Sequence, residues 1–363
     1  MIPKTTWKSA VSSFWKGATE PTLGTIAGIL GLVIFQIVVL CWYWTPQRMA
    51  QIKQSWVPNS FSSQYAYTSV IANRLKYLPS TDNSVVMVST SSGRNSIHNF
   101  DQTSQQLSLT TGLTTNFYML STAGQTIWES GIILDCLPTD FNGVVIFSVG
   151  LKRLTWGHDT LETHHKTPRI AVNSSFLLNE TKLAGLAMQK PSGIFLLDYR
   201  NFFFEFGFQA ARAAMQGYPK SLHLTSNRQR NNEEHWKTYL QRLNQQKKLF
   251  AENSSYNLGV LARIIGQLQE KDIPVVLMES TLHPRTYQIM GSDYLQYRHT
   301  IEEFATTQHL PYWNLNNEAE LSAADFMDNV HISNPDARKR YQHILVQHLA
   351  ELIKQEQTTI DLK

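Results

Sequence analysis

The longest apolar run in the chain is residues 23–44, LGTIAGILGLVIFQIVVLCWYW, which contain no charged side chain. As a helix this run would be about 33 Å long, and the hydrocarbon core of a bilayer is about 30 Å thick. Trp42, Tyr43 and Trp44 at its end are typical of a membrane interface. A cleaved signal peptide has a shorter apolar region followed by small residues. The pattern therefore predicts a single transmembrane helix.

The charges before this run predict its orientation. Three lysines precede it: Lys4, Lys8 and Lys16. Because cytoplasmic flanks are enriched in basic residues, we expect residues 1–22 to stay in the cytoplasm and the rest to lie outside the plasma (inner) membrane. Residues 45–80 are polar and aromatic with several prolines. They are expected to form a stalk that leads to an extracytoplasmic domain at residues 81–363.

Beyond the stalk, short β-branched runs alternate with helical patterns. The expected strands are residues 84–89, 116–121, 143–150, 273–280 and 311–315, and the expected helices include residues 125–137, 258–268 and 294–304. Several strands are apolar almost throughout, as parallel strands buried on both faces are. A final helix begins where Asn334 can cap and Pro335 takes the first position. This alternation predicts an α/β fold, a three-layer α/β/α sandwich around a central parallel sheet.

One long stretch, residues 156–253, has helical patterns and no clear strand. We expect it to be a helical insertion over the carboxyl edge of the sheet, where folds of this class bind their ligands.

Composition narrows the class of protein. The apolar content is 42% and the charged content 17%, which is typical of a folded globular body and unlike a disordered chain. The net charge is only +4 and the basic residues are scattered, so nucleic acid is not an expected partner. Cys41 lies in the apolar run and Cys136 in an expected helix, so no structural disulfide is predicted.

Chemistry is suggested by Asp328 and His331 in FMDNVHISNP. A histidine acts as a general base toward a hydroxyl when a carboxylate orients it and stabilises its cation. Ser91 is the candidate nucleophile, because VSTSSGRN follows the first strand of the domain; Ser89 and Ser92 remain alternatives. An ordinary Ser/Thr-rich turn that caps the next helix is the competing interpretation.

This combination resembles the SGNH (GDSL-like) hydrolases and acyltransferases over residues 84–352. These proteins place the nucleophile after the first strand and a D-x-x-H near the C-terminus, which implies Ser91, Asp328 and His331. The segment STAGQTIWES is similar to their second block, whose glycine N–H donates to the oxyanion, and this implies Gly124. The backbone N–H of Ser91 or Ser92 would be the other donor.

The sequence departs from the family at the third block, which usually provides an oxyanion-hole Asn. Here residues 148–154 read SVGLKRL. Loss of one such donor lowers rates by about 10²–10³ in other hydrolases. Another group replaces the Asn, the activity is low, or the domain has become an accessory protein.

The layout of one anchor and an outer domain is similar to that of the alginate O-acetylation proteins and the D-alanylation protein of teichoic-acid synthesis. The resemblance implies a serine esterase or O-acyltransferase that acts on a cell-envelope polysaccharide or related polymer. Its partner would be a multi-span membrane O-acyltransferase or synthase. The alternative is an inactive accessory subunit that binds the polymer or scaffolds such a synthase.

Two further clusters are candidates. Glu279, His283 and Arg285 follow a predicted strand in ESTLHPR, so they are expected to face the same edge as Ser91 and to bind a sugar or carboxylate. The acidic residues and histidines of WGHDTLETHHK follow no recognisable metal-site spacing. We expect a solvated loop there, and neither a metal nor a cofactor.

Overall fold

A computed structural model describes residue 12 and residues 23–78, 82–187, 190–216 and 233–361. Its centre is one open sheet of five parallel strands in the order β2-β1-β3-β4-β5. The strands are β1 (Asn83–Ser89), β2 (Thr115–Ser121), β3 (Gly143–Val149), β4 (Val275–Glu279) and β5 (Tyr312–Trp313). The prediction of an α/β fold with a parallel sheet is confirmed.

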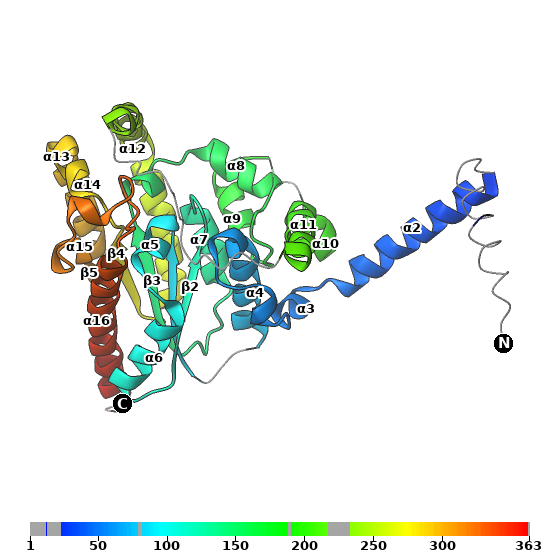
Figure 1. The fold of residues 1–363 in the computed structure, drawn as a ribbon, viewed down its shortest axis with the longest axis horizontal. Helices are drawn as coiled ribbons and strands as arrows, with labels where there is room; N and C mark the ends of the chain where they lie inside the picture. The colour runs from blue at the N-terminus through cyan, green and yellow to red at the C-terminus, as the bar shows by residue number, and fades with distance from the viewer. Residues whose placement is uncertain (1–11, 13–22, 79–81, 188–189, 217–232, 362–363) are drawn as a thin grey trace.

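The sheet is covered by helices on both faces (Figure 1). Alternate residues of each strand face opposite sides, so Val86 and Phe147 join one apolar cluster whereas Met87 and Ile146 join another. The first cluster includes residues of α4 (Gln64–Tyr77), α7 (Ile127–Asp135) and α12 (Glu233–Gln269). The second includes residues of α6 (Phe100–Thr111) and α16 (Pro335–Asp361).

The strand order fixes where a ligand can enter. From β1 the chain moves to β2 on one side of it, and then crosses back to β3 on its other side. A crevice forms outside the carboxyl ends of two such neighbouring strands. The segments that follow β1 and β3, namely α5 (Ser91–Ser96) and a 3₁₀ turn (Leu151–Leu154), therefore flank this crevice.

The stalk prediction is wrong for much of residues 45–80. Residues Pro46–Ala50 form α3, and α4 packs against the body instead of linking it to the membrane. The reason is an apolar stripe at four-residue spacing: Tyr67, Ile71 and Leu75 are all buried in the first cluster. Proline and aromatic residues made the segment look like a linker, while its spacing is that of an amphipathic helix.

The described residues of the stretch from 156 to 253 form helices joined by loops and contain no strand. It contains α8 (His158–Lys166), α9 (Phe176–Leu183), α10 (Phe195–Asp198) and α11 (Arg200–Gln216). The next helix, α12, begins at Glu233 and runs without a break past residue 253, so the expected end of the insertion lies inside one helix. Helices α13 (Pro284–Met290), α14 (Ser292–Thr307) and α15 (Leu315–Glu318) complete the body.

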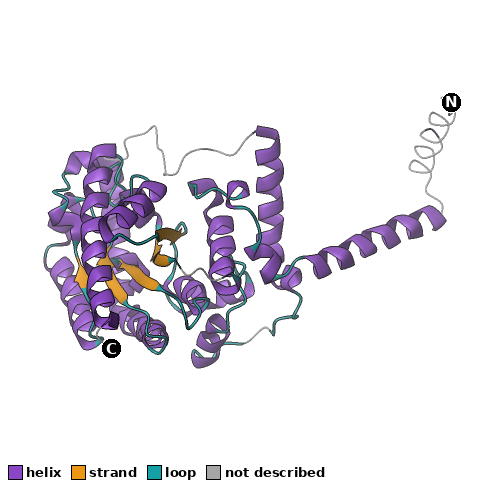
Figure 2. Cartoon of the chain, turned by 90° about the horizontal axis from the view of Figure 1, so that it is seen from below, coloured by secondary structure: helices purple, strands orange, loops and turns teal. Residues whose placement is uncertain are grey.

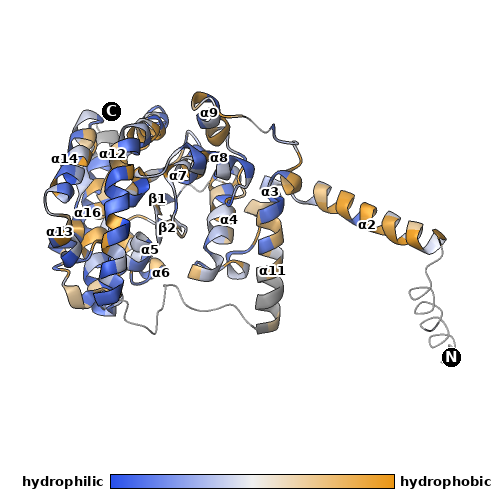
Figure 3. Ribbon diagram, turned by 90° about the horizontal axis from the view of Figure 1, so that it is seen from above, coloured by the Kyte–Doolittle hydropathy of each residue, from blue (hydrophilic) through white to orange (hydrophobic). Residues whose placement is uncertain are grey.

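The N-terminal apolar run forms α2 (Leu23–Tyr43), which projects from the body with its side chains uncovered (Figure 2). Its hydrophobic colour is nearly continuous in Figure 3. Among the described helices, it is the one long and apolar enough to cross a membrane. Apart from Ser12, the expected cytoplasmic segment 1–22 lies outside the described residues, so the orientation stays a prediction.

Candidate active site

Ser91 lies at the carboxyl end of the sheet, where β1 ends and α5 begins. The turn between them is tight because α5 packs directly on the strand. A Cβ atom at Gly93 would stand 2.0 Å from Ser89 Oγ, so only glycine fits there. Ser89 is completely buried beneath this contact. Of the serines considered from the sequence, Ser91 is the one that meets His331.

Three side chains from the two ends of the domain form a hydrogen-bond chain. His331 Nε2 lies 2.8 Å from Ser91 Oγ, and His331 Nδ1 lies 2.8 Å from Asp328 Oδ2. The loop that carries the pair folds back on itself, because Asp328 Oδ1 accepts hydrogen bonds from the backbone N–H groups of Val330 and His331 at 3.0 and 2.9 Å. The D-x-x-H spacing therefore positions the ring through its own backbone.

The carboxylate of Asp328 is well stabilised. Burial raises its pKa, but the hydrogen bond and charge of His331 and the two backbone N–H donors outweigh burial and lower the pKa to about 2. An ionised carboxylate accepts the proton of Nδ1, which leaves Nε2 free to accept the proton of Ser91. Chemically, the arrangement can turn the Ser91 hydroxyl into a nucleophile.

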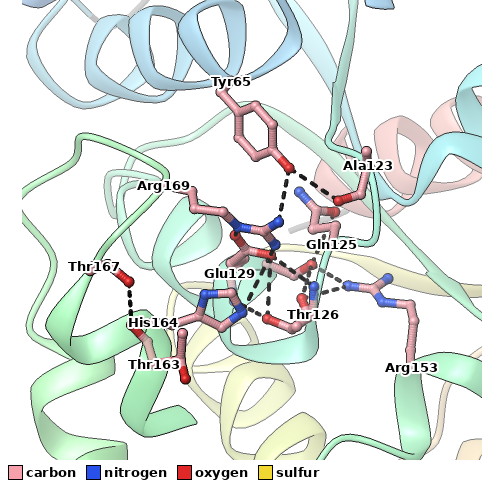
Figure 4. Close-up of polar contacts among 11 residues, drawn as sticks. Tyr65, Ala123, Gln125, Thr126, Glu129, Arg153, Thr163, His164, Thr167 and Arg169 are labelled. Atoms are coloured by element: carbon pink, nitrogen blue, oxygen red, sulfur yellow. Dashed lines mark hydrogen bonds and ion pairs between the residues drawn. The ribbon is translucent and has the colours of Figure 1, made fainter. Parts of the chain in front are cut away.

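Gly124 lines the cavity that Ser91, Ser92 and His331 also line. This cavity has a volume of about 340 Å³. The φ of Gly124 is +62°, a left-handed conformation that favours glycine. The carbonyl of the preceding residue, Ala123, accepts a hydrogen bond of 3.1 Å from Tyr65 Oη on α4 (Figure 4). The turn that contains Gly124 is thus tied to the helix that was expected to be a stalk.

Two arginines fix the rest of this turn (Figure 4). Arg169 binds the buried Glu129 carboxylate through both oxygens, at 2.8 and 2.6 Å, and also donates to Tyr65 Oη at 2.9 Å. Glu129 in turn accepts a hydrogen bond of 3.0 Å from the backbone N–H of Thr126. From the other side, the buried Arg153 donates to the Thr126 carbonyl at 3.2 Å. No local pattern in the sequence indicates this network, because its members are scattered from residue 65 to 169.

The segment after β3 brings a cation to the cavity, next to a second one from α12. Lys152, which follows Gly150 after β3, lines the cavity together with Arg242 of α12. Burial lowers the pKa of the Lys152 ammonium, and the positive charge of Arg242 lowers the pKa further. The Lys152 ammonium also lies 5.4 Å from the ring centre of Trp156. The signal in the sequence was the pair of basic residues in SVGLKRL, directly after a buried strand.

Of the three residues expected in ESTLHPR, only Glu279 lines the cavity. Its carboxylate is buried and accepts hydrogen bonds from Tyr294 and Tyr312 at 2.8 and 2.9 Å and from Asn314; burial raises its pKa. His283 caps α13 by accepting a hydrogen bond from the backbone N–H of Arg285. Arg285 pairs with the exposed Glu233. His283 and Arg285 do not line the cavity, and their role in binding a sugar or carboxylate stays a prediction.

The histidine-rich segment expected as a solvated loop is helix α8. His164 turns inward to 3.9 Å from Glu129, whereas Glu162 pairs with Lys166 at the surface.

No protein-family model matches the sequence, and a search of curated proteins finds no significant match. A parallel α/β sheet supports many unrelated activities. Function must therefore be inferred from the side chains at the carboxyl edge of the sheet.

Proposed function

We propose that the protein is a membrane-anchored serine esterase or O-acyltransferase of the SGNH type. The observation that carries the proposal is the hydrogen-bond chain from Ser91 Oγ through His331 to Asp328. Side chains 240 positions apart meet at the sheet edge where α/β enzymes bind substrates. The two-sided helical cover of the sheet is consistent with the flavodoxin-like sandwich of that family.

The reaction proceeds in two halves. Ser91 Oγ forms a bond to the acyl carbon while its proton passes to His331 Nε2, and Asp328 stabilises the imidazolium. The leaving alcohol then departs with that proton, leaving an acyl-Ser91. Water or an acceptor hydroxyl then gives its proton to His331 and attacks the acyl carbon, and the bond to Ser91 Oγ breaks as Oγ takes the proton back from His331. The backbone N–H of Ser91 or Ser92 and that of Gly124 hold the oxyanion.

The acceptor we propose is a cell-envelope polysaccharide or related polymer that carries negative charge. Two cations, Lys152 and Arg242, line the cavity beside the nucleophile. Neither forms an ion pair with a carboxylate among the residues that the structure describes. A carboxylate or phosphate of the polymer would complement them. The acyl group would come from a multi-span membrane O-acyltransferase or synthase, with the catalytic domain outside the plasma membrane.

A second candidate is an accessory subunit that keeps the SGNH shape without catalysis. The absence of the third-block Asn favours it, because residues 148–154 offer no amide side chain. The continuous hydrogen bonding of Ser91 to His331 argues against it.

Substitution of the nucleophile and base separates the two candidates. We expect Ser91→Ala and His331→Ala each to lower cleavage of a p-nitrophenyl ester at least about 10³-fold, since members of such a triad act as a unit. Ser91→Ala should also abolish labelling by a fluorophosphonate probe. Ser89→Ala is the matched control, because the Ser89 side chain is fully buried and cannot reach a substrate. Wild-type protein without esterase activity and without Ser91-dependent labelling would establish the accessory role instead.

A further inference from the structure

Helix α11 exposes several large apolar side chains to solvent. Phe204, Phe208 and Met215 are 79%, 66% and 80% exposed. At about 100° per residue, these three positions fall within about 40° of one another around the helix axis. They form one apolar face, which we call the outer face of α11.

The opposite side of α11 packs against the body. Phe202 is buried in a cluster with Met49 and Val70, and Phe206 packs against this cluster. By the same helical geometry, Phe202 and Phe206 lie about 160–200° around the axis from Phe204. Helix α11 therefore attaches to the body by one set of phenylalanines and points a second set away from it.

Helix α11 lies beside the end of α2. Trp44, the residue after α2, packs against Phe203 of α11 with ring centres 5.1 Å apart, and α10 also contacts α2. Figures 1 and 3 show α11 at the side of the body from which α2 emerges, and α11 runs across the direction of α2. A helix perpendicular to a span lies parallel to the membrane plane.

The residues at this junction are those of a lipid interface. Trp42 is 83% exposed at the end of the apolar run, and the exposed Arg48 stacks its guanidinium 5.6 Å from the ring centre of Tyr43. Tryptophan, tyrosine and arginine at the end of a span sit at the level of the lipid headgroups. The contact between Trp44 and Phe203 brings α11 to that same depth.

We propose that the outer face of α11 inserts into the outer leaflet of the bilayer that α2 crosses. Helix α11 then acts as an interfacial helix, with Phe204, Phe208 and Met215 among the acyl chains near the headgroups. Two attachments, the span and this helix, hold the domain in one orientation on the membrane. The proposal rests on the membrane span within the proposed function and is independent of the ester chemistry.

The position of α11 next to the end of α2 favours lipid over a protein as the occupant of its outer face. Helix α11 adjoins α2, whose uncovered side chains need the same apolar surroundings. A lipid surface supplies them to both helices at once, whereas a protein partner would have to match both shapes.

The test places an environment-sensitive probe on this face in the full chain. Phe208→Cys is labelled with NBD in a Cys41→Ala background; the remaining Cys136 is buried. The protein is reconstituted into phosphatidylcholine and phosphatidylglycerol vesicles at about one chain per vesicle. We expect NBD emission to shift to the blue and to be quenched by lipids that carry a nitroxide on the acyl chain.

Leu295→Cys on α14 is the matched control, because Leu295 is 64% exposed and α14 lies at the end of the body away from α2 (Figure 1). Its label should remain in water and unquenched. Equal emission from the two labels would overturn the proposal, as would a blue shift of the Phe208→Cys label that requires crowded vesicles or an added membrane protein. Adding Ser91→Ala should leave the signal unchanged, so a failure here and a failure of the proposed catalysis are separate results.

Discussion

At the scale of single residues, Asp328 links the proposed catalysis to stability. Its carboxyl pKa falls from 3.8 to about 2 in the folded protein. A lowered pKa in the folded state adds stability above the unfolded pKa, and this stability is lost as the pH falls through the folded pKa. The shift corresponds to about 2 kcal/mol of the free energy of unfolding.

We therefore expect Asp328→Asn to unfold about 2 kcal/mol more easily than the wild type at pH 6, with the difference shrinking between about pH 4 and pH 2. Urea denaturation across this pH range measures it. Asp336→Asn is the control, because Asp336 is exposed, pairs with Lys339 and lies in the first turn of α16, contributions that together should change stability by less than about 1 kcal/mol. A deficit of constant size from pH 6 to pH 2 would contradict the assignment of the stabilisation to the Asp328 charge.

Lys152 is the residue that distinguishes substrate binding from catalysis. If its ammonium binds a charge on the acceptor, Lys152→Met should raise KM for an anionic ester about five- to tenfold and leave a neutral ester unchanged. Steady-state kinetics on one ester of each kind decides this. Lys248→Met, at an exposed position on α12, is the control. Equal losses of kcat on both esters would instead make Lys152 the group that replaces the missing Asn at the oxyanion.

At the scale of elements, the turn that contains Gly124 depends on a buried ion pair. The Glu129 side chain is 2% exposed and its partner Arg169 36%. Arg169→Met would leave the carboxylate buried without its partner, so we expect a loss of about 3 kcal/mol in the free energy of unfolding. Esterase activity should fall as well, because Arg169 holds the Tyr65 hydroxyl that binds the Ala123 carbonyl.

Thermal and urea unfolding of Arg169→Met measures this loss in the free energy of unfolding. Lys166→Met, which removes a surface cation, is the matched control. Lys166 pairs with Glu162 at the surface, and its loss should change stability by less than about 0.5 kcal/mol. Similar stabilities for the two variants would show that water satisfies Glu129 without the arginine.

The elements also show what the sequence can and cannot predict. Buried parallel strands are uninterrupted apolar runs, and Asn334 and Pro335 mark the start of α16. The strands and the start of this helix could therefore be predicted directly from the sequence. The approach of Asp328 to His331 follows from local spacing. The contact between Glu129 and Arg169 spans 40 positions, and no local pattern indicates it. For α4 the apolar residues have the spacing of an amphipathic helix, but the proline and aromatic content of the segment is typical of a linker and obscured this spacing.

At the scale of the whole molecule, one apolar helix carries a body whose reactive edge is built from both ends of the domain. The strands alone place Ser91 at that edge, whereas the loop before α16 brings His331 to it. Any cut between them separates nucleophile from base.

The side of the membrane on which this body lies is set by charge. Lys4, Lys8 and Lys16 precede the span, so we expect the body to be extracytoplasmic. A membrane-impermeant maleimide applied to intact cells should label Leu109→Cys, whose position on α6 is 85% exposed, and should label Ser9→Cys only after permeabilisation. Both variants are made in the Cys41→Ala background, so buried Cys136 gives the background labelling. The reverse pattern would place Ser91 in the cytoplasm, where no cell-envelope polymer could reach it, and the proposed substrate class would fail with it.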